Sequence, residues 1–137
     1  RYGLGAAAPE AAKRMRAALQ ALAGRGKRRV ALYGAGTHTR AMGGVLMQPP
    51  VEIVCLIDDD PRLAGTRLWN YPIVPAEQAV ASGLDAVVIS SNSREEELRE
   101  AASALDAAGV EIITLYADEG VARADFSPAA AARTDAA

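Results

Sequence analysis

Short apolar runs recur along the middle of the chain, separated by polar and amphipathic stretches. Residues 29–33, 51–57, 86–90 and 111–116 are apolar at most consecutive positions, instead of at every second position. Strands that bury both faces have this pattern, which is typical of a parallel sheet covered by helices on both sides. The pattern therefore predicts four buried parallel strands and leaves room for a short fifth strand at 73–74.

The stretches between these runs carry helical signals. Apolar residues recur at helical spacing, which predicts helices over 8–23, 38–47 and 93–108. Ser93 and Glu96 have the spacing of a capping box at the start of the last helix. Because strands and helices alternate, we expect an α/β fold: a doubly wound, Rossmann-like parallel sheet of about four to five strands, with an extra N-terminal helix.

The order of the strands follows from the handedness of their connections. Right-handed crossovers place strand 29–33 in the middle, between 51–57 and 86–90. The point where the order reverses is where open α/β sheets bind ligands, at the carboxyl ends of the strands. The predicted order across the sheet is 73–74, 51–57, 29–33, 86–90 and 111–116.

The turn after strand 29–33 is the clearest chemical feature. In a dinucleotide-binding turn, the first glycine permits a tight turn, the second lets the backbone approach a pyrophosphate, and the third lets the helix pack on the strand. Gly34 and Gly36 fill the first two places, and Thr39 stands in the third, so the fingerprint is incomplete. The turn holds a phosphate at the start of the next helix, or it is a tight turn without a ligand.

Polar residues end the two neighbouring strands. Asp58 lies about 20 residues beyond the glycines, where a carboxylate hydrogen-bonds a ribose diol, and Asp59 and Asp60 compete for this role. A solvated strand end is the alternative. Residues 90–93 fall at the switch point or simply cap the next helix. The candidate ligand-binding residues are Gly34, Ala35, Gly36, Thr37, His38, Thr39, Arg40, Asp58, Asp59, Ser90, Ser91 and Asn92.

A few further side chains are candidates for chemistry near the turn. His38 is the only histidine and the only catalytic candidate, and a helix N-terminus would lower the pKa of its imidazole. It is equally read as a polar residue at a helix start. Arg40 either reaches phosphate oxygens or pairs with the aspartates. Trp69 and Tyr71 stack on a ligand or pack over the sheet edge.

The composition and charge of the chain limit which kinds of binding partner the sequence predicts. The net charge is −2, and the basic cluster within the first 29 residues has no aromatic residues interleaved with it, so a solvated helix face is favoured over a nucleic-acid patch. One cysteine and one histidine cannot assemble a zinc site, so no metal is expected. The apolar runs are far shorter than the roughly 20 residues that cross a bilayer, so we expect no membrane partner and a cytoplasmic protein.

Three segments are expected along the 137 residues. Residues 1–27 are predicted to be a helix and a basic linker, and residues 28–117 a Rossmann-like nucleotide-binding domain. Residues 118–137 are an Ala-rich tail without periodicity. Because the first residue is not Met, the sequence is open to being a fragment of a longer chain.

The run YGAGTHTRAM, followed by VEIVCLIDDDPRLAGTRLWNYPIV, resembles a known family. It is similar to the Rossmann-type nucleotide-binding domain of bacterial sugar-nucleotide and polysaccharide biosynthesis proteins, over residues 28–116. This group includes the amino-terminal domain of sugar acyltransferases and the domain accompanying nucleotide-sugar dehydratases and epimerases. The resemblance implies a UDP-sugar on the residues matching Gly34, Gly36, His38 and Asp58, or NAD(P) on the glycines and the carboxylate.

Three functions remain open at this stage. The first is a nucleotide-binding module for NAD(P) or a nucleotide-sugar, with catalysis in a neighbouring domain or subunit. The second is an NAD-dependent oxidoreductase or epimerase-type component. The third is a ligand-free interaction domain, with a homodimer as its product. The sequence carries neither β-helix repeats for acyl transfer nor a Tyr-x-x-x-Lys pair, so no reaction is assigned.

Overall fold

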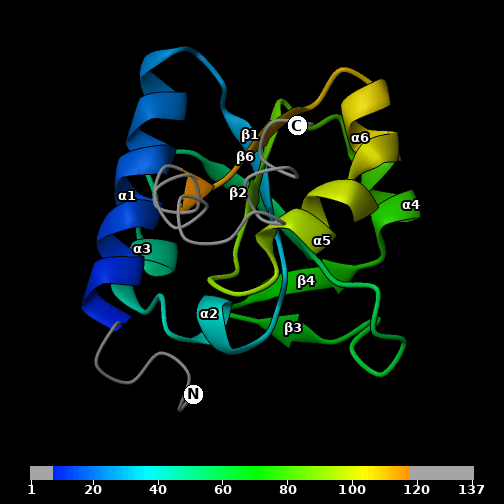
Figure 1. Ribbon diagram of the computed structural model, residues 1–137, viewed down its shortest axis with the longest axis horizontal. Coiled ribbons are helices and arrows are strands. Elements are labelled where there is room, and N and C mark those ends of the chain that lie inside the picture. Colours follow the sequence, from blue (N-terminus) through cyan, green and yellow to red (C-terminus); the bar gives the residue numbers. More distant parts are fainter. Residues whose placement is uncertain (1–7, 118–137) are drawn as a thin grey trace, which may run out of the picture.

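The computed structural model describes residues 8–117, which form three layers (Figure 1). A sheet runs through the middle, with α1 and α3 on one side and α4, α5 and α6 on the other. Alternation of strands and helices along the chain produces this arrangement. In chain order the elements are α1 (Ala8–Gly24), β1 (Arg29–Tyr33), α2 (Thr37–Arg40), α3 (Gly44–Met47), β2 (Glu52–Ile57), β3 (Arg67–Leu68), β4 (Tyr71–Val74), α4 (Ala76–Ala79), the 3-10 helix Val80–Ser82, β5 (Ala86–Ile89), α5 (Glu95–Ala101), α6 (Ser103–Ala107) and β6 (Glu111–Ile113).

The sheet has six strands in the order β3-β4-β2-β1-β5-β6. Neighbouring strands are parallel except for β3 and β4, which pair antiparallel. The structure confirms the predicted Rossmann-like fold class and the predicted order of five strands. The point of reversal lies between β1 and β5, as the crossover rule requires.

The strand β3, which forms a hairpin with β4, is not predicted from the sequence. Trp69 and Asn70 make the two-residue turn, with φ angles of 54° and 66°. Two-residue hairpin turns need such left-handed residues, and asparagine tolerates them better than tryptophan. The Trp69 indole N–H donates to the carbonyl of Thr39 at 2.8 Å, which holds the residue in this conformation.

The consecutive apolar positions of β1 serve two cores, one on each face of the sheet. Val30 and Leu32 pack with the buried stripe of α1, and Ala31 and Tyr33 pack toward α5 and α6. All four side chains are buried. Successive residues of a strand point to opposite faces, so a strand between two helical layers must be apolar at both. The buried stripe of α1 consists of Ala11, Met15, Leu19 and Leu22.

Two predicted helices are wrong in their extent. The helix expected over 38–47 is split into α2 and α3, and Gly43 lies between them with a φ of 54°. The helix expected over 93–108 begins at Glu95 and breaks at Ala102 into α5 and α6. Within the described chain, no helix is long and apolar enough to cross a membrane.

The expected capping box at Ser93 is also wrong. The N-cap residue of α5 is Arg94, and its side chain makes no capping bond, while the hydroxyl of Ser91 accepts the backbone N–H groups of Ser93 and Arg94, at 3.3 and 2.9 Å, ahead of the helix. The strand expected over 111–116 ends at Ile113. The next backbone N–H groups, those of residues 115 and 116, bind the carboxylate of Glu95 instead of a neighbouring strand.

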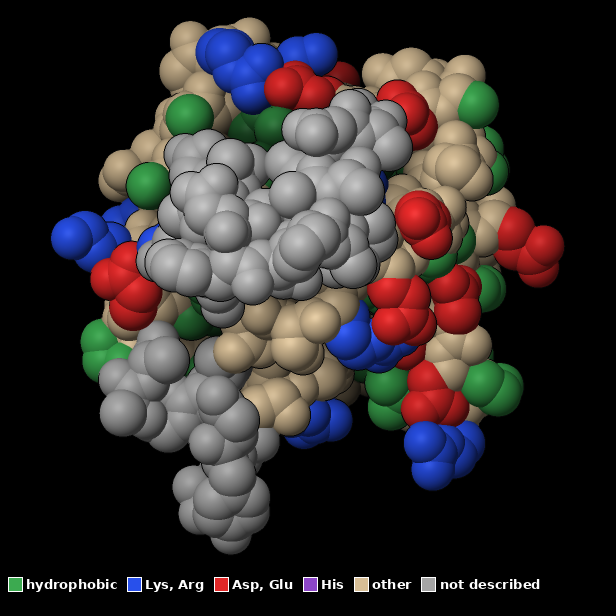
Figure 2. Space-filling model, in the orientation of Figure 1, with side chains coloured by type: hydrophobic (Ala, Val, Ile, Leu, Met, Phe, Trp, Pro, Cys, Tyr) green, Lys and Arg blue, Asp and Glu red, His purple; other side chains and the backbone are tan. Residues whose placement is uncertain are grey.

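The basic residues between positions 25 and 29 lie at the amino ends of the strands, at the opposite end of the sheet from the glycine turn. Arg25 and Lys27 pair with Glu111 at 3.0 and 3.9 Å, and Arg29 pairs with Glu52 at 3.3 Å. Figure 2 shows basic and acidic side chains side by side at this end of the molecule. These cations therefore have acidic partners within the fold.

Candidate functional site

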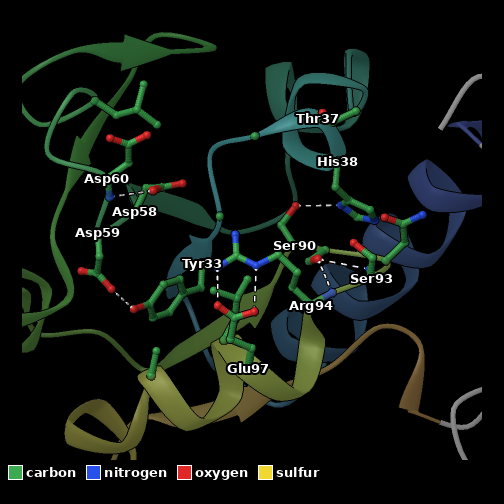
Figure 3. Close-up of a pocket in the computed structure, with 17 residues that line it drawn as sticks. Tyr33, Thr37, His38, Asp58, Asp59, Asp60, Ser90, Ser93, Arg94 and Glu97 are labelled. Carbon is green, nitrogen blue, oxygen red and sulfur yellow. Dashed lines mark hydrogen bonds and ion pairs between the residues drawn. The ribbon is translucent and has the colours of Figure 1, made fainter. Parts of the chain in front are cut away.

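A pocket of about 680 Å³ opens at the carboxyl ends of β1, β2 and β5. Figure 3 shows its walls: the glycine turn and α2 on one side, the aspartates after β2 on another, and the start of α5 facing them. This is the switch point of the sheet, where the sequence analysis expects a ligand. The lining residues are Tyr33, Gly34, Gly36, Thr37, His38, Asp58, Asp59, Asp60, Leu63, Ser90, Ser91, Asn92, Ser93, Arg94, Glu97, Leu98 and Ala101.

Gly34 is a glycine because the fold requires one. Its φ is +115°, a conformation that other residues rarely adopt, and a Cβ there would lie 2.9 Å from the carbonyl oxygen of Ser90. Its N–H also continues the sheet by donating to the carbonyl of Ile57 at 2.7 Å. The first glycine thus lets the end of β1 pass close to the end of β5.

Gly36 is a glycine for a different reason. Its φ is −99°, and a Cβ there would meet no protein atom within 4 Å. No packing contact of the described chain demands that the side chain be missing, although its ψ of −145° lies outside the regions that residues with a Cβ favour. The space in front of Gly36 belongs to the pocket, so its backbone is open to close approach by a ligand.

Asp58 is the aspartate that faces the glycine turn. Its Oδ2 accepts the backbone N–H of Ala35 at 3.0 Å, and its Oδ1 accepts the N–H of Asp60 at 2.9 Å. One amide of the turn is therefore already bound by the protein's own carboxylate. A carboxylate has about four lone-pair sites, so Asp58 keeps acceptor capacity toward the pocket.

The other two aspartates are directed elsewhere. Asp59 accepts the hydroxyl of Tyr33, and its second oxygen accepts the N–H of Ala76 at 2.9 Å. Burial, together with the hydrogen bond to Asp59, raises the pKa of Tyr33 far above its ordinary value, so the phenol is protonated. Asp60 pairs with Arg62 at 2.9 Å on the surface. Of the three candidates, only Asp58 therefore lies on the turn.

His38 lies beneath the turn and is 4% exposed. Its Nδ1 is 2.8 Å from the Ser90 hydroxyl, and its Nε2 is 2.7 Å from the Tyr116 hydroxyl. Burial lowers the pKa of His38 to about 4, so the imidazole is neutral near pH 7. The sequence predicts that the helix N-terminus lowers the pKa of His38, whereas the structure gives burial as the cause.

Thr39, in the place of the third glycine, links the start of the turn to the end of β5 by hydrogen bonds. Its hydroxyl donates to the carbonyl of Gly34 at 2.5 Å and lies 2.7 Å from the Ser90 hydroxyl. Because Thr39 has one hydroxyl hydrogen, a bond to the carbonyl leaves Ser90 to donate to Thr39 and to accept Nδ1–H of His38. The side chain is fully buried, so it takes the packing position of a glycine and adds a polar anchor.

Nine of the twelve residues proposed from the sequence line the pocket. Ala35 and Thr39 are buried behind it, and Arg40 is exposed outside it. Trp69 and Tyr71 pack against the α1-side core, and the Tyr71 hydroxyl donates to the carbonyl of Leu46 at 2.5 Å. The nine lining residues are Gly34, Gly36, Thr37, His38, Asp58, Asp59, Ser90, Ser91 and Asn92.

Three polar residues of the pocket are not predicted from the sequence: Tyr33, Arg94 and Glu97. Tyr33 is the last residue of β1, and the other two belong to the start of α5. No spacing rule indicates them, because their place depends on how α5 folds back over the sheet. Within residues 8–117, no group of three or more His, Cys, Asp or Glu side chains is placed to hold a metal ion.

A family model described as C2185-like, N-terminal, matches residues 26–113 of the chain. The chain belongs to this family. The match spans β1, the glycine turn, the aspartates and β6, and thus the whole pocket. No curated protein matches this C2185-like chain.

Solved structures similar to this C2185-like domain share its fold. UDP-D-quinovosamine 4-dehydrogenase from Vibrio fischeri is 21% identical, with a TM-score of 0.49, over 64% of this chain and 77% of that one. RSP, a Rex-family repressor, is 12% identical, with a TM-score of 0.50, over 73% of this chain and 58% of the repressor. The complex of RSP with beta-NADH has the same identity and TM-score, with 59% of that chain covered. The C2185-like chain thus spans less than two thirds of the repressor's length.

Proposed function

We propose that residues 28–117 of this C2185-like protein are a nucleotide-binding module of a sugar-nucleotide or polysaccharide biosynthesis protein. The module holds NAD(P) or a nucleotide-sugar, and catalysis takes place in another domain or subunit. The observation that carries this proposal is the open space at Gly36, a glycine that no packing contact of the described chain requires. A ligand backbone in van der Waals contact with that position would explain why a side chain is missing.

The pocket offers a place for each polar part of a nucleotide. Phosphate oxygens would lie against Gly36 and Thr37, and the ribose diol would donate to the free lone pairs of Asp58. Ser91 and Asn92 line the facing wall. The fold is compatible with such a ligand, since RSP is solved in complex with beta-NADH.

The chemistry of the pocket supports a binding role over a catalytic one. His38 is the sequence's single histidine, and both of its ring nitrogens have hydroxyl partners. With a pKa of about 4, it is a weak base at neutral pH, whereas general bases work best with a pKa near the operating pH. His38 is therefore poorly suited to proton transfer, which favours catalysis in another domain or subunit.

A ligand-free interaction domain is the second candidate, and one observation favours it. The carboxylate of Asp58 already binds the Ala35 N–H, so part of the turn is satisfied without a ligand. Stabilisation by a nucleotide separates the two candidates. A carboxylate at Asp58 would repel a ribose 2′-phosphate, so we expect NAD to bind more tightly than NADP.

Thermal unfolding in the presence of NAD(H), NADP(H), UDP and UDP-sugars tests the proposal. A ligand at about 100 times its dissociation constant adds about 2.7 kcal/mol, which raises the Tm by several degrees. The Gly36→Val variant should lose the shift, because its side chain enters the space in front of the turn, and its own Tm without ligand is the baseline.

Gly24→Val is the matched control, since Gly24 at the end of α1 also has no protein atom near a Cβ and lies outside the pocket. It should keep the full ligand-induced shift. No shift with any of these nucleotides at millimolar concentration, for the unmutated chain, would leave the ligand-free interaction domain as the function. A shift that persists in Gly36→Val would place the ligand elsewhere.

A further inference from the structure

The charge of the pocket conflicts with the ligand proposed for it. Four acidic side chains line the pocket, and Arg94 is the only Lys or Arg among the lining residues of the described chain. Phosphate groups are anions, so a wall of this composition repels them unless a cation faces them. Figure 2 extends the contrast, since acidic side chains gather over the side of the molecule where α5 and α6 lie. The four acids of the pocket are Asp58, Asp59, Asp60 and Glu97.

Asp58 and Asp59 are held by backbone N–H groups, whereas Asp60 and Glu97 each pair with an arginine close in sequence. Asp58 and Asp59 each accept a backbone N–H from the main chain opposite, and Asp60 accepts the guanidinium of Arg62. The structure pairs Glu97 with Arg94, which itself faces the pocket. The negative charge of Glu97 is thus compensated by the one cation that a phosphate would need.

The backbone of Arg94 is fixed, while its side chain makes an exposed ion pair. Its N–H donates to the Ser91 hydroxyl at 2.9 Å. Its Nε and Nη2 donate to the two oxygens of Glu97 at 3.1 and 2.7 Å, and the two side chains are 57% and 64% exposed. Exposed ion pairs contribute little to stability, so exchange of the partner is inexpensive.

The position of the guanidinium suits a phosphate. Figure 3 shows the side chain of Arg94 reaching from the start of α5 into the pocket, beside Tyr33 and Ser90 and above Glu97. A guanidinium presents a planar fork of N–H donors that matches a phosphate as well as it matches a carboxylate. The bidentate contact with Glu97 therefore has the geometry that a phosphate would take over.

We propose that Arg94 is the anion-binding side chain of this pocket, which leaves Glu97 and takes a phosphate group when a phosphate-bearing nucleotide binds. Glu97 holds the guanidinium in the pocket of the free protein and competes with the phosphate for it. This inference rests on the proposed function and narrows the ligand to a nucleoside diphosphate or a dinucleotide, in place of an uncharged nucleoside.

The test is the dissociation constant of Arg94→Gln and Glu97→Gln, measured by calorimetry with NADH, UDP and inorganic pyrophosphate. Arg94→Gln should weaken binding about tenfold to hundredfold, because it removes charge-assisted hydrogen bonds to the phosphate. Glu97→Gln should tighten binding about two- to fivefold, because the competing exposed ion pair is lost. A purely structural ion pair would make both variants change in the same direction.

Arg99→Gln and Glu100→Gln are the matched controls. Both residues are exposed, lie on or beside the same turn of α5, and are outside the pocket, so they make the same charge changes at a distance. Binding by these two variants should equal that of the unmutated chain. Adenosine and uridine, which lack phosphate, should show no difference between any of the variants.

The outcomes separate this inference from the proposed function. If the unmutated chain binds NADH or UDP, but Arg94→Gln and Glu97→Gln match their controls or shift together, the inference is wrong and the proposed function stands. If only pyrophosphate binds, and Arg94→Gln abolishes it, the anion site is supported and the nucleotide module is not. If none of the three probes binds, both are wrong.

Discussion

The two ends of the same parallel strands differ in how their charges are used. At the amino ends, basic side chains meet acidic ones directly, as Arg25 meets Glu111 and Arg29 meets Glu52. Asp85 accepts the backbone N–H groups that precede and begin β1. These hydrogen bonds lower the pKa of Asp85 and keep it ionised. The charges at this end have partners within the fold.

At the carboxyl ends, acidic side chains outnumber basic ones around an open pocket. Polar groups there bind the backbone or one another, as Asp58 binds the turn and Ser90 binds His38. Space remains beside Gly36 that no part of the described chain fills. The difference indicates that the charges at the amino ends are used within the fold. The carboxyl ends keep open space and acidic side chains around the pocket, where the ligand is proposed to bind.

The largest expected effect on the free energy of unfolding comes from substitutions of Gly34 and Gly36, which lie at the carboxyl end of β1. Gly34→Ala should lower the free energy of unfolding by about 3 kcal/mol, because it combines a positive φ with a contact of 2.9 Å to the backbone of Ser90. Gly36→Ala should lower it by only about 1 kcal/mol, because no protein atom lies near the added Cβ and only the ψ of −145° is unfavourable. Urea denaturation of the two variants measures both values. Equal losses would mean that Gly36 also serves the fold.

The second largest expected effect is the change in the free energy of unfolding when the buried His38 is protonated at low pH. The pKa of His38 is about 4 in the folded protein and about 6.5 in the unfolded chain, so stability is fully present above pH 6.5 and falls as the pH falls toward 4. Between pH 7.5 and 5 the free energy of unfolding should fall by about 2 kcal/mol, at about 1.36 kcal/mol per pH unit below 6.5.

Urea denaturation over this pH range measures the slope, and His38→Gln is the control that cannot titrate. The acids with lowered pKa values, Asp60, Asp85 and Glu97, lose their contribution at lower pH, below their ordinary values of about 4. The window above pH 5 therefore isolates the histidine. A slope that persists in His38→Gln would show that another group causes it.

The sequence predicts the sheet well because its signals are local and consecutive. The run at 29–33 predicts β1 at its observed bounds, and the crossover rule orders five strands. The hairpin strand β3 is not predicted, because Trp69-Asn70 is not the usual sequence of a two-residue hairpin turn. The break at Ala102 has no local signal either, because alanine is the best helix former. Packing of α5 and α6 over the sheet determines it.

The site also contains residues that the sequence predicts and residues that it does not. The meeting of Gly34, Gly36 and Asp58 follows from the rule that parallel strands end at one edge of the sheet, so spacing along the chain is enough. Arg94 and Glu97 enter the pocket from a helix whose start the sequence misplaces by two residues. Their contribution depends on tertiary packing, which a single sequence does not encode in any local pattern.

The smallest expected effect comes from the two acids at opposite ends of β2. Glu52 begins the strand and pairs with Arg29 across an exposed surface, at 3.3 Å, while Asp58 follows the last residue of the strand. Glu52→Gln should change the free energy of unfolding by at most about 0.5 kcal/mol, since surface ion pairs contribute little. It should leave the dissociation constant for NADH or UDP unchanged.

Asp58→Asn removes the same charge from the other end of the strand, and it should weaken that binding about tenfold, because the carboxylate accepts from the ribose in the proposed complex. Calorimetry and urea denaturation of the pair measure both quantities in one background. Equal effects of the two substitutions on binding would mean that only the net charge of the protein matters. The functional difference between the two ends of the sheet would then have to be abandoned.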